Sequence, residues 1–364
     1  MRVLQILPHL SKGGAERVVI ELSNSLVEIG NEVTVLTAFP VDSTLNQHEL
    51  SKRVRVQFVS ASRESRLQQY LSLPLWIARN WKDLKTYDVI HCHLTYGLVI
   101  GMLLAIRRRV SKSNHLKLVA TCHVVGVGVS TFPRVVNERL SYFFDYFVLM
   151  AQDSHWRRFI TLNKRGNISV IANGISPNLV GRPHRIDGGN LPYTVGTISR
   201  LHHERKPWLF LETFGHLQNM NYGAVRFRLG GDGSERKKLV ELSKKMGLDR
   251  TLSMPGLVKD PNDFLSSLDL YIALNIEDIT GIAGLEAIFS GTPVIAIQLA
   301  PDYQSGACDW IWSSQDTLKV AEKIKEYLEN PVQLSALAKE QYKTAIDKFS
   351  AKQMRDNYLS LYSS

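Results

Sequence analysis

Two hydrophobic periodicities alternate along most of this chain. Runs of four to nine residues that are apolar, or alternate between apolar and polar positions, predict β-strands. Between them lie longer segments in which apolar residues recur every three or four positions, which predicts helices; residues 15–28 are one example. Strands that alternate with helices form parallel sheets covered on both faces. In the first half, strands are predicted at 2–7, 32–37, 54–59, 88–93, 117–121, 142–150 and 169–172.

The pattern divides the chain into two α/β domains. Residues 177–192 show no periodicity and are rich in Gly, Pro and Arg, which is typical of a linker. We expect an N-terminal domain at 1–180, a linker at 181–192, a C-terminal domain at 193–340 and a closing helical segment at 341–364. In the second half, strands are predicted at 194–198, 225–229, 251–254, 269–274 and 293–297, and helices at 208–218, 234–246, 263–267, 284–290, 317–330 and 332–362.

Chemically reactive side chains follow the predicted strands. Open α/β sheets bind ligands outside the carboxyl ends of their strands. His123 comes just after the strand at 117–121 and is therefore a site candidate, whereas His91 and His93 are expected to make structural hydrogen bonds. Loop residues that follow the strands of the second domain are Arg200, Lys206, Gly230, Gly256 and Asp278.

Two acids surround the start of a predicted helix in the second domain. Asp278 lies in the loop after the strand at 269–274, and Glu286 lies in the first turns of the following helix. A carboxylate can accept hydrogen bonds from two neighbouring sugar hydroxyls, and Arg200 and Lys206 can neutralise a diphosphate. Together, these two acids and two cations predict a binding site for a nucleotide sugar. The competing interpretation is that the cations lie on the surface and the acids cap a helix.

Charge is distributed unevenly over a chain of net charge +10. Residues 1–185 carry 24 Lys and Arg against 12 Asp and Glu, while the remainder carries 20 against 22. A basic first half would be drawn to an anionic membrane surface, a diphosphate-bearing lipid or nucleic acid, or would simply be a basic domain. The predicted helix at 67–84 combines Trp76 and Trp81 with basic residues, which suits either a membrane interface or core packing.

The number of cysteines and the length of the apolar runs indicate in which cellular compartment the protein resides. Three cysteines without a metal-type spacing predict reduced thiols and a cytoplasmic protein. We expect no signal peptide, because the first apolar run is too short. Residues 94–106 form the longest apolar run, and its 13 residues fall short of the ~20 needed to span a bilayer. We therefore expect a buried helix there.

Several motifs, spread over nearly the whole chain, resemble those of one enzyme family. With them the chain resembles the family-4 retaining glycosyltransferases of the GT-B fold. They are GGAER at 13–17, DVIHCH at 88–93, TCH at 121–123, IANGI at 171–175, GTISRL at 196–201 with Lys206, GGDG at 230–233, PG at 255–256, the acids Asp278 and Glu286 followed by GTPV at 291–294, and FS at 349–350 with Tyr358.

The resemblance implies an α/β GT-B fold, with two Rossmann-like doubly wound domains facing across a cleft. It implies a retaining, metal-independent transfer of a hexose or N-acetylhexosamine from a nucleotide sugar, with a UDP-sugar favoured and no other cofactor. The implied catalytic residues are His123, Arg200, Lys206 and Asp278. The implied donor-binding residues are Gly13, Gly14, Arg200, Lys206, Gly230, Gly256, Leu257, Asp278, Gly281, Ile282 and Glu286.

The same resemblance suggests a setting for the reaction. The acceptor would be a glycan, lipid-linked, in the synthesis of bacterial surface polysaccharide or lipopolysaccharide such as O-antigen. The protein would be cytoplasmic and peripheral on the anionic inner face of the membrane, with no nucleic-acid partner. One departure concerns the first acid: the family usually has Glu followed by Gly-Phe-Gly, where this chain has Asp278, Ile279, Thr280 and Gly281. A carboxylate shorter by one methylene bears on the identity of the donor sugar.

Two other functions fit the same residues. A nucleotide-sugar epimerase of the same two-domain shape would need neither an acceptor nor a basic face. A non-catalytic protein that binds a sugar nucleotide or a membrane is favoured only by Asp278. A nicotinamide oxidoreductase is disfavoured, because the first loop lacks the GxGxxG pattern.

Overall fold

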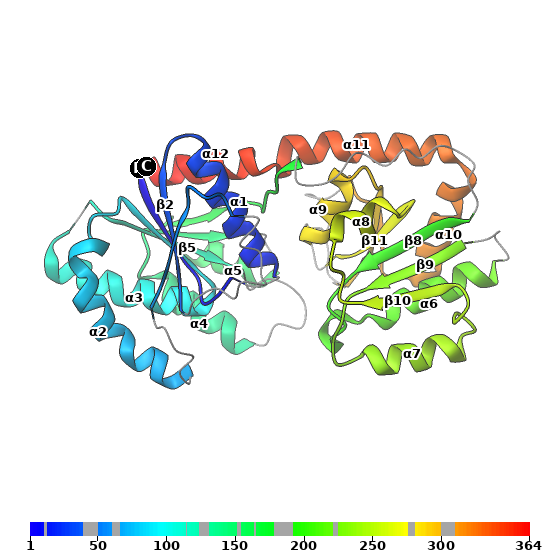
Figure 1. Cartoon of the computed structure of the whole chain (residues 1–364), viewed down its shortest axis with the longest axis horizontal. Coiled ribbons are helices and arrows are strands. Elements are labelled where there is room, and N and C mark those ends of the chain that lie inside the picture. Colours follow the sequence, from blue (N-terminus) through cyan, green and yellow to red (C-terminus); the bar gives the residue numbers. More distant parts are fainter. Residues whose placement is uncertain are drawn as a thin grey trace. The chain divides into compact units, whose positions relative to one another are not determined.

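The computed structural model divides into two compact units, each an α/β domain built on one parallel sheet (Figure 1). The first unit comprises the described residues up to Gly174 together with 351–364, and the second comprises those from Ile175 to Ser350. The structure describes residues 1–10, 13–38, 50–59, 66–113, 115–123, 131–150, 154–163, 165–177, 192–220, 225–275, 281–299 and 310–364.

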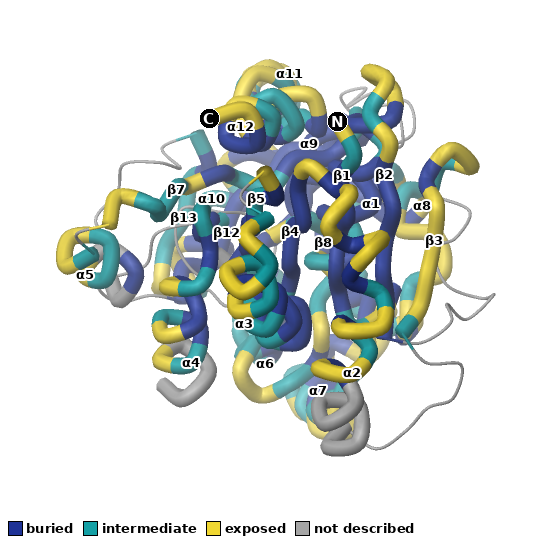
Figure 2. The backbone as a smooth tube through the Cα atoms, turned by 90° about the vertical axis from the view of Figure 1, so that its left-hand side faces the viewer, coloured by how far each residue is buried: buried dark blue, intermediate teal, exposed yellow. Residues whose placement is uncertain are grey.

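The described part of the first unit contains a seven-stranded sheet in the order β3-β2-β1-β4-β5-β6-β7. Every neighbouring pair is parallel, as the alternation of strands and helices predicts. The central strands are buried, whereas the edge strand β3 is exposed along its length (Figure 2). The strands are β1 (Arg2–Ile6), β2 (Glu32–Thr37), β3 (Arg55–Phe58), β4 (Val89–His93), β5 (Lys117–Cys122), β6 (Tyr146–Leu149) and β7 (Ile168–Val170).

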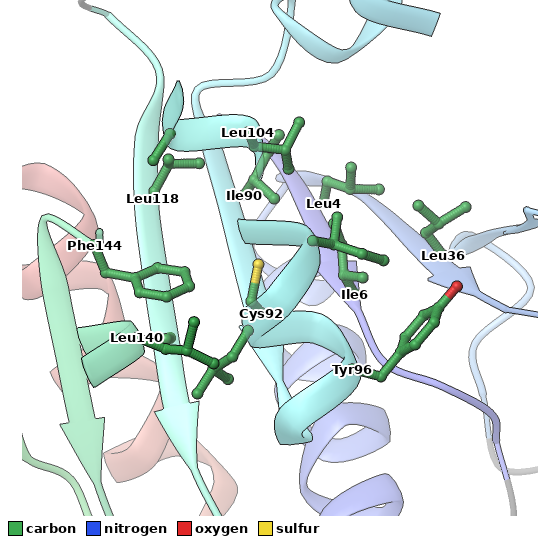
Figure 3. Packing of buried hydrophobic residues seen from close by; sticks show 14 of the residues in the cluster. Leu4, Ile6, Leu36, Ile90, Cys92, Tyr96, Leu104, Leu118, Leu140 and Phe144 are labelled. Carbon is green, nitrogen blue, oxygen red and sulfur yellow. The ribbon is translucent and has the colours of Figure 1, made fainter. Parts of the chain in front are cut away.

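Alternation of side chains along these strands gives the first sheet two different faces. On one face, Leu4, Ile90 and Cys92 pack with Leu104 of α3 into an apolar core (Figure 3). Helices α1 and α12 contact each other and cover the other face. The helices of this unit are α1 (Gly14–Glu28), α2 (Arg66–Leu84), α3 (Leu94–Ser111), α4 (Thr131–Ser141), α5 (Ser154–Leu162) and α12 (Ala351–Ser363).

Helix α3 is the apolar helix expected in the first half. Leu98, Ile100 and Leu104 are fully buried, because they pack against β4 and β5. Each such side chain contributes roughly 1.5–3 kcal/mol to folding. Within the described residues, no helix is both long enough and apolar enough to cross a membrane.

The described part of the second unit has a six-stranded parallel sheet in the order β10-β9-β8-β11-β12-β13. Its strands are β8 (Tyr193–Ile198), β9 (Val225–Gly230), β10 (Leu252–Gly256), β11 (Leu270–Asn275), β12 (Val294–Gln298) and β13 (Ser313–Ser314). Its helices are α6 (Trp208–Asn219), α7 (Arg236–Lys245), α8 (Pro261–Ser266), α9 (Ile282–Phe289), α10 (Thr317–Glu329) and α11 (Pro331–Phe349), with a 3₁₀ turn at His203–Arg205.

The core of the second unit lies between its sheet and helices α6 and α10. Phe214 of α6 stacks on Phe227 of β9, with ring centroids 4.5 Å apart, and Ile324 of α10 is fully buried in the same cluster. Helices α8 and α11 each contact α9. The loops that follow β8, β9, β10 and β11 all leave the sheet at its carboxyl edge, because the strands are parallel.

The C-terminal segment differs from the single predicted helix at 332–362. It consists of α11 and α12, separated at Ser350, whose backbone is extended at φ −75° and ψ 152°. Ser350 forms an isolated parallel bridge with Ile175, which interrupts the helix. Helix α12 belongs to the first unit, where the sulfur of Met354 accepts a hydrogen bond from the Gly174 amide. Most of the predicted linker at 181–192 lies outside the described residues.

Candidate active site

The loops after β8, β9 and β10 are bound together by backbone hydrogen bonds. The Ser199 amide donates to the Gly230 carbonyl at 3.0 Å, and the Gly231 amide donates to the Gly256 carbonyl at 2.7 Å. The Leu201 amide donates to the Asp232 carbonyl at 2.9 Å. Three strand ends thereby form one connected backbone surface in the second unit. Two predicted donor-binding residues, Gly230 and Gly256, lie on it.

A glycine is required at the centre of this surface. Gly231 has φ +124°, a conformation that L side chains rarely adopt, and a Cβ there would meet the carbonyl oxygen of Ser199. Ser199 immediately precedes Arg200. The tight approach of the two loops therefore fixes the backbone from which Arg200 projects.

Three cations occupy the segment after β8. Arg200 is exposed and Lys206 is half-buried. Burial, and then the positive charge of Arg200, lowers the pKa of the Arg205 guanidinium. Two guanidinium groups that repel each other in the free protein would be stabilised by a bound anion. Arg205 is an addition to the residues that the sequence predicts, and its position beside Lys206 is the signal that points to it.

Lys206 adopts an unusual backbone conformation. It has φ +44°, in the left-handed region, and it ends the 3₁₀ turn through a hydrogen bond from its amide to the His203 carbonyl. Such strain in a residue other than glycine persists only where the surroundings enforce it, and it is commonest at functional sites.

Helix α9 positions the second of the two acids. It begins at Ile282, with Gly281 as the N-cap residue, and places half-buried Glu286 in its second turn. Burial, and to a smaller extent the charge of Glu286, raises the pKa of Tyr271 to about 12. The Tyr271 hydroxyl donates to the Ile198 carbonyl at 3.1 Å. Glu286 is therefore near Tyr271, whose hydroxyl reaches Ile198 at the carboxyl end of β8, and its role in donor binding stays a prediction.

The remaining predicted residues of this unit have mixed positions. Leu257 is 65% exposed just after β10, where an apolar side chain facing water can cover a bound ring. Asp278, together with Ile279 and Thr280, lies outside the described residues. The role of that acid stays a prediction.

The glycines of the first unit introduce helix α1. Gly13 is its N-cap residue in extended conformation, and Gly14 is its first helical residue. The carboxylate of Glu16 is buried and lies against Gly13, and it is 3.5 Å from His9 Nε2. The structure thus places a carboxylate beside the helix end that was predicted to hold a phosphate. Phosphate binding by Gly13 and Gly14 stays a prediction.

His123 follows β5 and is joined to a neighbouring strand. Its Nε2 lies 3.1 Å from Nδ1 of His93, at the end of β4. Nε2 of His93 lies 2.6 Å from Oε1 of Gln5 in β1. Burial lowers the pKa of His123 to about 4, and burial, followed by the charges of the other two histidines, lowers the pKa of His93 well below its usual value. Both rings are therefore neutral near pH 7.

His91 lies beside this row and is joined to α12. Its Nδ1 is 2.7 Å from the Tyr362 hydroxyl and its Nε2 is 2.7 Å from Thr121 Oγ1, which in turn lies 2.8 Å from the Tyr358 hydroxyl. The expectation of structural hydrogen bonds for His91 and His93 is confirmed. Cys92 and Cys122, which lie near these histidines, are buried thiols that are not part of a disulfide, and Cys308 lies outside the described residues.

The two tryptophans of α2 contribute to the core. Trp81 is 5% exposed, Trp76 packs against the same cluster, and the Arg107 guanidinium lies 5.5 Å from the centre of the Trp81 ring. The core-packing interpretation is therefore correct for these two tryptophans. No group of three or more His, Cys, Asp or Glu that could hold a metal ion occurs among the described residues.

Two protein-family models match consecutive parts of the chain. The model described as Glycosyltransferase Family 4 matches residues 12–179, and the one described as Glycosyl transferases group 1 matches residues 192–330. Together they cover well over half of the sequence. The chain belongs to the family-4 glycosyltransferases. The first model covers most of the sheet that carries His123, and the second covers Arg200, Lys206 and Glu286.

Curated glycosyltransferases match shorter stretches. The chain is 24% identical over 178 residues to the poly(ribitol-phosphate) α-N-acetylglucosaminyltransferase of Staphylococcus aureus, which covers 47% of this chain and 35% of that protein. It is 26% identical over 137 residues to the lipopolysaccharide core biosynthesis glycosyltransferase LpsE of Rhizobium meliloti, which covers 37% and 40% of the two proteins. The match thus spans about two fifths or less of each relative.

Solved glycosyltransferase structures match the whole chain. HepE of Anabaena, crystallised with UDP-glucose, superposes with a TM-score of 0.75 over 100% of this chain and 99% of that one, at 20% sequence identity. At this identity the match establishes the fold. The two parallel α/β units of this family-4 glycosyltransferase are those of a GT-B protein.

Proposed function

We propose that this protein is a retaining glycosyltransferase that moves a hexose or N-acetylhexosamine from a UDP-sugar to a glycan acceptor. The observation that carries the proposal is the convergence of three cations and Glu286 at the carboxyl edge of the second sheet. That combination fits a nucleotide sugar: the cations would bind its diphosphate, and Glu286 would bind the two neighbouring hydroxyls of its ribose. Family membership supplies the reaction class.

The cations and the backbone have a defined role in this proposal. Arg200, Arg205 and Lys206 would bind the diphosphate and offset the charge that develops on it as the sugar leaves. Gly256 leaves the backbone after β10 without a side chain, which would let the base or ribose approach closely, whereas a Cβ at Gly230 would meet Val258 and Phe264 inside the unit. With this much fixed positive charge, we expect no metal ion in the transfer step.

The acids and His123 would hold the sugars. Glu286 would accept hydrogen bonds from the two hydroxyls of the ribose, since its carboxylate is half-buried and near the strand ends. Asp278 would contact the transferred sugar, and His123 would contact that sugar or the acceptor. The acceptor oxygen would bond to the anomeric carbon on the face from which the diphosphate departs, as the bond between that carbon and the phosphate oxygen breaks and the departing phosphate takes the proton of the acceptor hydroxyl. Attack on that face would keep the anomeric configuration of the sugar.

The choice of UDP and of a surface glycan rests on the relatives. HepE was crystallised with UDP-glucose, the S. aureus relative transfers N-acetylglucosamine to poly(ribitol phosphate), and LpsE belongs to lipopolysaccharide core synthesis. We extend these chemistries to this protein as a UDP-sugar donor and a cell-surface glycan, in lipid-linked form.

A basic and apolar strip on the first unit suits an anionic membrane surface. Helix α2 exposes Leu75, Arg79 and Lys82 at positions that share one side, and the end of α3 exposes Arg109 and Val110. Helices α2 and α3 contact each other. We propose peripheral binding at the cytoplasmic face of the inner membrane through these residues. Replacement of Arg79 and Arg109 by Glu should reduce co-sedimentation with phosphatidylglycerol vesicles, and unchanged binding would contradict this role.

The function is tested with a panel of UDP- and GDP-sugars. We expect one UDP-sugar to raise the melting temperature, and we expect UDP release to depend on an added acceptor: poly(ribitol phosphate), lipopolysaccharide core or lipid-diphosphate-linked N-acetylglucosamine. Conversion of the donor into an epimer with no acceptor would show an epimerase instead. Binding without turnover on any donor or acceptor would show a non-catalytic protein.

Matched variants connect the result to the site. Glu286→Gln removes the charge at the proposed ribose contact and should weaken donor binding. Glu241→Gln changes an exposed acid on α7 and should leave binding unchanged. Equal effects of the two substitutions would remove the support for Glu286.

A further inference from the structure

A buried polar row crosses the three central strands of the first sheet. Gln5 of β1 pairs in register with His91 of β4, and His93 of β4 pairs with Thr121 of β5. Gln5, His91, His93 and Thr121 are all fully buried. A polar group with no hydrogen bond in such a position costs roughly 1–3 kcal/mol. Val3 and Leu7, which alternate to the same face of the sheet as Gln5, are fully buried, so apolar residues fit on this face. The amide of Gln5 therefore calls for an explanation beyond packing.

The direction of the hydrogen bonds in this row can be derived atom by atom. In the orientation that the structure gives the Gln5 amide, Oε1 faces His93 Nε2 at 2.6 Å, and Nε2 of Gln5 has no hydrogen-bond partner among the described residues. Oε1 can only accept, so with this orientation Nε2 of His93 carries a proton and donates it. His93 is neutral, because burial lowers its pKa far below 7. A neutral imidazole carries one N–H, so Nδ1 of His93 has none and must accept.

The same logic extends to His123. Its Nε2 lies 3.1 Å from the accepting Nδ1 of His93, so Nε2 of His123 carries the proton. Since burial lowers the pKa of His123 to about 4, this ring is also neutral near pH 7 and its Nδ1 has a free lone pair. Within the described part of the chain, that Nδ1 makes no hydrogen bond. His123 is half-buried, so it remains open to a ligand on one side.

We propose that Gln5 and His93 are positioning residues that fix His123 as the Nε2–H tautomer, so that Nδ1 presents a lone pair to the substrate. The inference rests on the proposed function, in which His123 contacts the transferred sugar or the acceptor. It also restricts the ligand: the group that contacts His123 must donate a hydrogen bond to Nδ1, as a hydroxyl or an amide N–H does. A carboxylate at that point, as in a uronic acid, would meet a lone pair and no proton.

The backbone around His93 is consistent with this role. Leu94, the next residue, has φ +59° although it is not glycine. Helix α3 starts directly at Leu94, which holds His93 at the junction of strand and helix. Strain of this kind is retained where the surrounding structure imposes it, so the position of the His93 ring is rigidly determined.

The test reads the tautomer directly, by NMR of protein labelled with ¹⁵N in histidine, without any substrate. In the wild type we expect the ¹⁵N shifts of His123, assigned with a His123→Gln variant, to show a protonated Nε2 and a bare Nδ1. His93→Leu removes the acceptor and should give a mixture of tautomers. His93→Asn, whose amide oxygen can take the place of Nδ1, should restore the wild-type tautomer. A proton on Nδ1 of His123 in the wild type, or no change in His93→Leu, would overturn the proposal.

Gln5→Leu and Tyr358→Phe form a matched pair for activity. Tyr358→Phe cuts a bond to Thr121 in the same network but leaves the hydrogen bonds from Gln5 through His93 to His123 intact. With transfer as the readout, Gln5→Leu should lower kcat about tenfold, the equivalent of one lost hydrogen bond, with a smaller change in the KM for donor. Tyr358→Phe should change kcat less than twofold. Equal losses in both variants would mean that the row has only a structural role.

The two proposals fail in different ways. If the protein transferred no sugar, the tautomer of His123 would still be measured, and only the kinetic comparison would be lost. If His123 carried its proton on Nδ1 while the protein still transferred sugar, the proposed function would stand, and Gln5 and His93 would have no positioning role.

Discussion

Replacement of Gly231 by alanine should disturb the second unit far more than the same change at Gly247. Both residues have positive φ, +124° and +68°, so both variants place a side chain on a backbone that disfavours it. Their surroundings differ. A Cβ at position 231 falls on the carbonyl oxygen of Ser199, whereas the nearest atom to a Cβ at position 247 is Nε2 of Gln218, at 3.9 Å.

The difference in cost can be estimated. The left-handed conformation at Gly247 costs a non-glycine residue roughly 1–2 kcal/mol. The backbone at Gly231 lies outside that region, where strain costs up to about 3 kcal/mol, and Ser199 must also move. The entropy lost from the unfolded chain is the same for both substitutions and cancels. We therefore expect Gly231→Ala to be at least about 2 kcal/mol less stable than Gly247→Ala, which for a unit of this size lowers Tm by a further 4–8 °C or so.

Differential scanning calorimetry of the two variants measures this difference, and titration with the UDP-sugar measures its effect on the site. Because Ser199 precedes Arg200, only Gly231→Ala should also weaken donor binding. Equal Tm values for the two variants, or full donor binding by Gly231→Ala, would refute the account of how the loop after β8 is positioned.

Three further predictions concern single side chains. Arg200→Ala and Arg205→Ala should each weaken UDP-sugar binding, and each should reduce its dependence on salt in isothermal titration calorimetry, because each removes a cation from the diphosphate; an unchanged salt dependence would place that residue outside the site. Glu286→Gln should weaken donor binding about 10- to 100-fold, because hydrogen bonds to a charged acceptor are worth roughly 1.5–3 kcal/mol, and wild-type affinity would exclude the ribose contact. The pKa of His123 is about 4 in the folded state and near 6.5 when the chain is unfolded, so the unfolded chain binds more protons between these pH values. The free energy of unfolding should therefore fall by up to about 3 kcal/mol as the pH drops from 6.5 to 4. Urea titrations of wild type and His123→Gln measure this slope, which the variant should reduce; identical slopes would contradict the assignment.

Periodicity along the sequence predicted the two parallel sheets well. The patterns at 88–93 and 269–274 are local, and they return as β4 and β11. Glu286 could be placed near the ligand edge for the same reason, since strand, loop and helix follow one another in sequence. These inferences need no knowledge of which distant segments meet.

Features that depend on distant contacts were not predicted. The break at Ser350 arises because that residue pairs with Ile175, and the apolar spacing of the helix continues across it. Strand β13 has two residues, too few for a period, and α4 was not predicted at all. The row from Gln5 to His123 exists only once β1, β4 and β5 are in register.

The fate of the sugar's anomeric carbon tests the central claim most directly. The protein would be incubated with its UDP-sugar, labelled with ¹³C at that carbon, and with a glycan acceptor, and the products identified by mass spectrometry and NMR. We predict that the label appears in the acceptor with the configuration it had in the donor, and that one UDP is released for each sugar transferred. A label that stays on the nucleotide as an epimer, is released only as free sugar, or reaches the acceptor with inverted configuration would contradict the proposal.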